Sequence, residues 1–141
     1  MIRRTFVQLV LAATMLAVGA PAAIAEPAKK GIVIQVSDSD TKTWNQALNV
    51  IKNIQAEYGK DKLDVELVVF GNGSGLLKFD SPLANRIDET LASGAKVSMC
   101  ENTMKGQKLV AADMHPKIGY VKAGVIEIIE KSKQGWTVVR P

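Results

Sequence analysis

Residues 95–104 read Ala-Lys-Val-Ser-Met-Cys-Glu-Asn-Thr-Met, and the predicted fold is built outward from this stretch. The run from Ala95 to Met99 is typical of a short buried strand, and residues 101–109 are predicted to form a short helix. Cys100, the only cysteine of the protein, stands at the junction between the two. If the protein performs chemistry, we expect it to do so at this junction.

Strands and helices alternate on both sides of this stretch. The predicted strands, compact runs rich in β-branched residues, are residues 31–36, 63–70, 95–99, 117–121 and 136–140. The predicted helices are residues 41–58, 82–93, 101–109 and 123–134. In the first helix the apolar side chains recur at helical spacing, at Trp44, Ala47, Leu48, Ile51, Ile54 and Tyr58. This alternation predicts an α/β fold of three layers, with a mostly parallel sheet of about five strands and helices on both faces.

The first 25 residues are expected to be a cleaved signal peptide. Arg3 and Arg4 precede an apolar run, and Ala23-Ile24-Ala25 is the small-residue pattern of a cleavage site. The run is too short to cross a bilayer comfortably. We therefore expect a periplasmic protein that is not held to the membrane after cleavage. The general export route is the simpler expectation, and the residues from Arg3 to Val7 also loosely match a twin-arginine signal. A polar lead, residues 26–30, then precedes a single domain, residues 31–141.

The charge and the cysteine content limit which functions are possible. Loss of Arg3 and Arg4 with the signal peptide lowers the formal net charge of +4 by two. No basic patch with interleaved aromatic residues is present, which argues against a nucleic-acid partner. A single cysteine cannot form an intrachain disulfide, so packing must hold the fold. The thiol is then either a small buried core residue or a reactive group.

Three segments follow the carboxyl ends of predicted strands, the edge where parallel α/β sheets collect ligands. Two of them supply the candidate ligand-loop residues Ser37, Asp38, Gly71, Asn72 and Gly73. The glycine-rich loop matches neither the dinucleotide fingerprint nor the phosphate-binding P-loop, and no cofactor is expected. The glycine-rich loop is either a tight connection between two elements or a place where the backbone closely approaches a ligand.

The third segment contains Cys100. At a helix start, free N–H groups and the helix dipole favour the thiolate over the thiol. Asn102 and Thr103 are candidate hydrogen-bond donors, and the only histidine, His115, is a candidate base. A thiolate in this position could accept a sulfane sulfur as a persulfide. The absence of a second cysteine argues against a dithiol oxidoreductase that works alone.

The residues around Cys100 also suggest charges that could act on the thiol and a possible copper site. Lys96 and Lys105 are candidate sources of positive charge near the thiol, and Glu101 opposes them. Cys100, Met104 and His115 together offer thiolate, thioether and imidazole, a set that suits Cu(I). The alternative is that the methionine belongs to helix packing, with no metal bound.

The order of elements resembles the DsrE/DsrF-like family, particularly its exported branch. The matching motifs are Cys100-Glu101-Asn102-Thr103-Met104, residues 121–129, residues 135–141 and Phe70-Gly71-Asn72-Gly73. The resemblance implies a flavodoxin-like domain over residues 31–141 that forms homo-oligomers.

It also implies a role in sulfur transfer, with Cys100 in the place of a persulfide-carrying cysteine. The expected function is a sulfur carrier or a sulfurtransferase-type relay, with a sulfur-donor or sulfur-acceptor protein as partner. The residues do not decide whether the protein is an enzyme. The alternative is a non-catalytic oligomeric module that binds a small ligand or Cu(I).

Overall fold

The computed structural model describes residues 29–141, and the predicted signal peptide lies outside them. The strands are β1 (Gly31–Val36), β2 (Asp64–Val69), β3 (Lys96–Cys100), β4 (Gly119–Val121) and β5 (Thr137–Val139). The helices are α1 (Thr41–Tyr58), α2 (Ala84–Ala92), α3 (Glu101–Gln107) and α4 (Gly124–Lys133), with 3₁₀ helices η1 (Gly71–Leu77) and η2 (Ala111–Asp113). The predicted alternation is confirmed, although α2 begins at Ala84 rather than Pro82. Among these helices none is long and apolar enough to cross a membrane.

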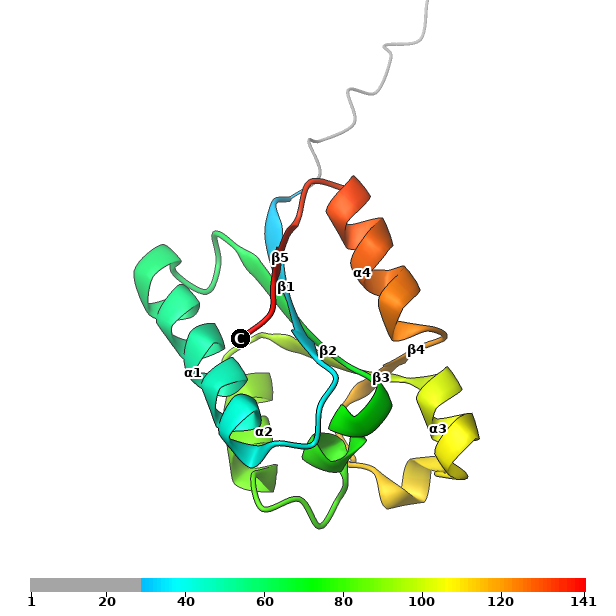
Figure 1. The fold of residues 1–141 in the computed structure, drawn as a ribbon. Coiled ribbons are helices and arrows are strands. Elements are labelled where there is room, and N and C mark those ends of the chain that lie inside the picture. The colour runs from blue at the N-terminus through cyan, green and yellow to red at the C-terminus, as the bar shows by residue number, and fades with distance from the viewer. Residues whose placement is uncertain (1–28) are drawn as a thin grey trace, which may run out of the picture.

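All five strands of the described chain run parallel in one sheet, in the order β4-β3-β2-β1-β5. Helices α1 and α2 and the turn η1 cover one face, and α4 covers the other (Figure 1). Helix α3 begins directly at the carboxyl end of β3. Helix α4 forms the crossover connection from β4, at one edge of the sheet, to β5, which pairs with β1 at the other edge. The predicted α/β architecture of sheet and flanking helices is therefore confirmed.

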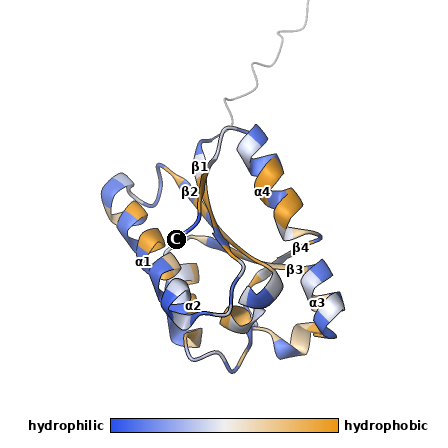
Figure 2. Cartoon of the chain, viewed as in Figure 1, coloured by the Kyte–Doolittle hydropathy of each residue, from blue (hydrophilic) through white to orange (hydrophobic). Residues whose placement is uncertain are grey.

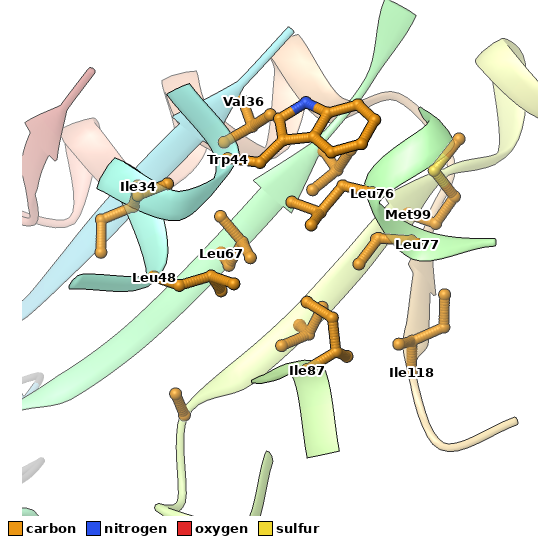
Figure 3. Packing of buried hydrophobic residues seen from close by; sticks show 14 of the residues in the cluster. Ile34, Val36, Trp44, Leu48, Leu67, Leu76, Leu77, Ile87, Met99 and Ile118 are labelled. Atoms are coloured by element: carbon orange, nitrogen blue, oxygen red, sulfur yellow. The ribbon is translucent and has the colours of Figure 1, made fainter. Parts of the chain in front are cut away.

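The face under α1 and α2 holds the larger hydrophobic core. Ile34, Leu67 and Met99 reach it from three neighbouring strands, and each is fully buried. Trp44 packs over them from the start of α1 (Figure 3). Tyr58, expected on the same helix face, is instead 57% exposed. It is the last residue of α1 and lies one turn beyond Ile54, which still packs against the core.

The opposite face is covered more thinly. Val33, Val68 and Ile128 form a small second cluster beneath α4. Val125, Ile126 and Ile129, on the same helix, are 50%, 54% and 43% exposed. Apolar residues therefore lie on the outer side of α4 as well as beneath it, which is visible as orange along the helix in Figure 2.

A buried carboxylate interrupts the apolar packing on the α4 side. Glu66, in the middle of β2, has no solvent exposure. Its Oε1 accepts a hydrogen bond from Ser98 Oγ at 2.7 Å and lies 3.1 Å from Lys96 Nζ. Lys131 Nζ, from α4, lies 3.4 Å from Oε2 and 4.2 Å from the centre of the Trp136 ring. An ion-pair network thus ties α4 to β2 and β3, because a buried charge must be paired.

Candidate functional site

Cys100 is the last residue of β3 and the N-cap of α3. Neighbouring side chains of a strand point to opposite faces, so Met99 enters the large core and Cys100 turns toward the α4 side. The thiol is 5% exposed. Its Sγ accepts a hydrogen bond from the Thr103 N–H at 3.4 Å. The predicted strand–thiol–helix junction is therefore confirmed.

Two helix starts converge on this sulfur. The Thr103 N–H of α3 donates to Sγ, and the N–H groups of Asn102 and of Gly124, at the start of α4, lie near enough to favour its ionised form. The Asn102 N–H also donates to the Lys122 carbonyl at 3.2 Å, which joins the two helix starts. Free N–H groups at helix starts carry partial positive charge and stabilise an anion.

The donors overcome the effect of burial on ionisation. Burial, the largest single influence, raises the pKa of the Cys100 thiol because it disfavours the charged form. The Thr103 hydroxyl and the N–H groups of Gly124, Thr103 and Asn102 lower it. Together they hold the pKa of Cys100 below its ordinary value. A lower pKa increases the fraction of thiolate, which is the nucleophilic form of cysteine.

Gly124 allows α4 to start this close to the sulfur. A Cβ at this position would lie 3.1 Å from Cβ and Cδ1 of Phe70, closer than side chains normally pack. Phe70 directly follows β2 and belongs to the cluster under α4. The absence of a side chain therefore lets the first turn of α4 approach the sheet.

The glycine-rich segment η1 is hydrogen-bonded to α3, the helix that begins at Cys100. The Gly71 N–H donates to Thr103 Oγ1 at 2.8 Å, which holds the Thr103 hydroxyl beside the site. Gln107 Nε2 donates to the Gly71 carbonyl at 2.9 Å, and Ser74 Oγ donates to Gln107 Oε1 at 2.6 Å. These three bonds join η1 to α3. Gly71 also has a φ of +58°, which glycine adopts without strain.

The other candidate loop residues surround the end of β1. A Cβ on Gly73 would lie 2.9 Å from the Val36 carbonyl oxygen, so η1 packs directly on that strand. Asn72 lies beside it within η1. The Asp38 carboxylate accepts from the Asp40 N–H at 3.2 Å. A Cβ on Gly71 would lie 3.5 Å from the carbonyl oxygen of Ser37, so the first two predicted segments do meet.

His115 lies in another part of the molecule. It precedes β4, and its Nε2 is 3.5 Å from Asp88 Oδ1 on α2. Its Nδ1 accepts from the Lys117 N–H at 3.4 Å. Lys117, foremost, and His115 lower the pKa of the Asp88 carboxyl. The structure therefore does not bring His115 to Cys100 as a base.

The proposed copper ligands are likewise separated. Met104 belongs to the large core, on the opposite side of the sheet from Cys100. His115 is bound to α2 as described. In residues 29–141 there is no cluster of three or more His, Cys, Asp or Glu side chains able to hold a metal ion.

Lys96 is also placed differently from expectation. It begins β3 and binds Glu66, whereas Cys100 ends the strand. The lysine beside the site is instead Lys122, which lines a hollow of about 340 Å³ together with Asn102, Val121, Ala123, Ile126 and Glu127. Cys100 does not line this hollow, but Val121, which does, pairs with Cys100 in the sheet. The hollow therefore lies on the strand next to the thiol.

Gly124 and Lys122 were missed in the sequence because they lie more than twenty residues from Cys100 along the chain. The motif around them, residues 121–129, did contribute to the family resemblance. Glu66 was missed as well, although an acid inside an apolar strand signals a buried ion pair.

The fold and the site define a class: a parallel α/β domain with one ionisable thiol at the carboxyl edge of its sheet. A family model for the DsrE/DsrF-like family matches residues 28–141, and the chain belongs to this family, which is associated with sulfur relay. Comparison with curated proteins gives no match.

Solved structures share the fold. A protein of unknown function, MTH1491 from Methanobacterium thermoautotrophicum, has a TM-score of 0.75 at 21% identity, covering 79% of this chain and 99% of that one. Conserved protein BT1422 of unknown function from Bacteroides thetaiotaomicron has a TM-score of 0.67 at 18% identity, covering 83% and 99%. The ychN protein from E. coli has a TM-score of 0.64 at 12% identity, covering 79% and 99%.

Replacing Thr103 with valine is expected to raise the pKa of Cys100, because the Thr103 hydroxyl is one of the groups that lower it. Valine keeps the branched shape of the threonine side chain and removes only its hydroxyl. The measurement is the pH dependence of Cys100 alkylation. Thr103→Ser, which retains the hydroxyl, is the matched control and should stay close to wild type. An unchanged profile in Thr103→Val would contradict a role for this hydroxyl.

Proposed function

We propose that the protein carries sulfane sulfur as a persulfide on Cys100. The observation that supports this most directly is the place of Cys100 as the N-cap of α3, where Sγ accepts from the Thr103 N–H and the nearby N–H groups of Asn102 and Gly124 lower the pKa of the thiol. Family membership adds the association with sulfur relay. The hollow lined by Asn102 and Lys122 offers a reactant access from the side of β4.

The transfer consists of one sulfur–sulfur exchange in each direction. The Cys100 thiolate attacks the outer sulfur of a polysulfide or thiosulfonate, and a new S–S bond forms. The old S–S bond breaks, and the shorter polysulfide or the sulfinate leaves with its electron pair. An acceptor thiolate then attacks the outer sulfur of the persulfide, and Cys100 leaves as thiolate, stabilised again by the same N–H groups. The Lys122 side chain attracts the anionic donor.

Intact mass measurement of the folded protein after incubation with inorganic polysulfide tests this proposal. We expect a gain equal to one sulfur atom, reversed by a thiol acceptor. Cys100→Ser should gain nothing. A wild-type protein that takes up sulfur only after unfolding would show that the thiol is a core residue and would overturn the proposal.

We also propose that two copies associate through the outer side of α4. Val125 and Ile129 are half exposed there, and burying such side chains contributes about 25 cal/mol per Å² of apolar surface. Light scattering should report an oligomer, and Ile129→Glu should shift it toward monomer. Lys133→Glu, an exposed change on the same helix, is the control. A monomer at all concentrations would contradict this association.

A further inference from the structure

A second hollow lies far from the thiol, between α1 and α2 on the outer side of the helical layer. It has a volume of about 320 Å³. Its lining residues come from the two helices and the turns that follow them: Leu48, Ile51, Lys52, Gln55, Ala56, Lys60, Arg86, Glu89, Thr90 and Ser93. Leu48 and Ile51, which are 2% and 1% exposed, close its floor, and Ala56 is exposed in its wall. The hollow is an apolar groove with polar walls.

The charges around this groove are unbalanced. Lys52, Lys60 and Arg86 contribute three positive charges, against one negative charge from Glu89. Within residues 29–141, no carboxylate lies within ion-pair distance of any of these three cations. Other lysines of the domain, such as Lys117 and Lys131, do have carboxylate partners.

Arg86 is held in place without being neutralised. Its Nη1 donates to Asn45 Oδ1 at 2.5 Å, and its Nη2 donates to Asn49 Oδ1 at 2.7 Å. Both acceptors are neutral amides, so the guanidinium keeps its full charge. It has five N–H donors, and some stay free to bind an oxyanion. A positioned guanidinium suits a carboxylate, which it can bind through two parallel hydrogen bonds.

We propose that this groove binds a small monocarboxylate with an apolar body. The apolar floor receives the body, and Arg86 and Lys52 receive the carboxylate at the rim. The volume is at the lower end of the range for small-molecule sites. Glu89 disfavours anions of higher charge by repulsion. The site is independent of Cys100, which lies on the opposite side of the sheet.

Titration of the isotope-labelled domain with octanoate, followed by amide chemical shifts, tests the proposal. We expect shifts to be concentrated in residues 48–56 and 86–93. Octanamide, which has the same body without charge, should bind about tenfold more weakly. Arg86→Gln should weaken octanoate binding about tenfold, the loss of one charge-assisted pair. Lys52→Gln, at an exposed position, should weaken it about two- to fivefold.

Lys133→Gln is the control, because Lys133 is an exposed lysine on α4, which covers the opposite face of the sheet. Its octanoate affinity should equal that of wild type. Equal binding of octanamide and octanoate would overturn the proposal, as would shifts located outside the groove or the absence of binding at millimolar octanoate. If Arg86→Gln does not fold, an octanoate affinity of Lys52→Gln identical to that of Lys133→Gln would overturn the proposal as well.

Discussion

Replacing both Lys96 and Lys131 with methionine is expected to lower the free energy of unfolding by about 3–5 kcal/mol, the range for a buried charge that loses its partners. Within residues 29–141, these lysines are the two cations that contact the fully buried Glu66 carboxylate. Methionine keeps an unbranched apolar side chain, so the main loss is charge. Ser98 alone would then remain to stabilise the carboxylate.

The single variants should differ. The side chain of Lys131 is 19% exposed and that of Lys96 is 56% exposed, so water screens the second pair more strongly. Lys131 also lies over Trp136, an interaction that adds about 0.5–2 kcal/mol. We therefore expect Lys131→Met to be more destabilising than Lys96→Met.

Urea unfolding followed by circular dichroism measures these differences. Lys133→Met is the control, because Lys133 pairs with Glu130 at the surface, where such pairs contribute about 0–1 kcal/mol. A double variant that unfolds at the wild-type urea concentration would contradict the ion-pair account of the α4 packing.

Trp44→Ala is expected to destabilise the domain by about 3–5 kcal/mol, as is typical when a buried tryptophan is truncated. Trp44 is 6% exposed and packs in the large core. A Cβ added to Gly75 would lie 2.9 Å from its Cη2, so the indole fills the space beneath η1. Its Nε1 donates to the Asp38 carbonyl at 2.8 Å, which fixes the loop after β1.

Trp44→Phe separates these contributions, since it keeps most of the packing but removes the N–H donor. The free energy of unfolding should fall less in Trp44→Phe than in Trp44→Ala. The missing hydrogen bond should account for about 0.5–1.5 kcal/mol of the decrease in Trp44→Phe. Unfolding followed by circular dichroism avoids the fluorescence change caused by losing an indole. If the free energy of unfolding of Trp44→Ala lay within about 1 kcal/mol of wild type, this role would be contradicted. A loss that small would mean that neighbouring side chains had filled the space left by the indole.

The fold could be predicted because its signals are local. The apolar run 31–36 and the helical spacing from Trp44 to Ile51 both follow from short-range periodicity. The order of the strands in the sheet is a long-range property, since β5 pairs with β1 from the far end of the chain. The exposure of the apolar residues on the outer side of α4 could not be predicted either. The amino-acid type of a residue does not show whether its side chain lies in the core or at the surface.

The candidate site was only half predictable for the same reason. Cys100 and Thr103 lie within one helix start, where capping rules apply. Gly124 reaches the sulfur only through the β3–β4 pairing, and Gln107 reaches Gly71 only through the packing of α3 on η1. His115 was nominated by residue type alone, and the turn before β4 directs it to Asp88 instead.

The pH dependence of Cys100 alkylation tests the ionised thiol most directly. The rate with iodoacetamide follows the thiolate fraction, so it rises with pH and levels off above the pKa. In the folded protein we predict a midpoint below that of the same protein unfolded in denaturant, because the donors from α3 and α4 are lost on unfolding. A folded-state midpoint at or above the unfolded one, or a thiol that reacts only after unfolding, would contradict a thiolate held at the edge of the sheet.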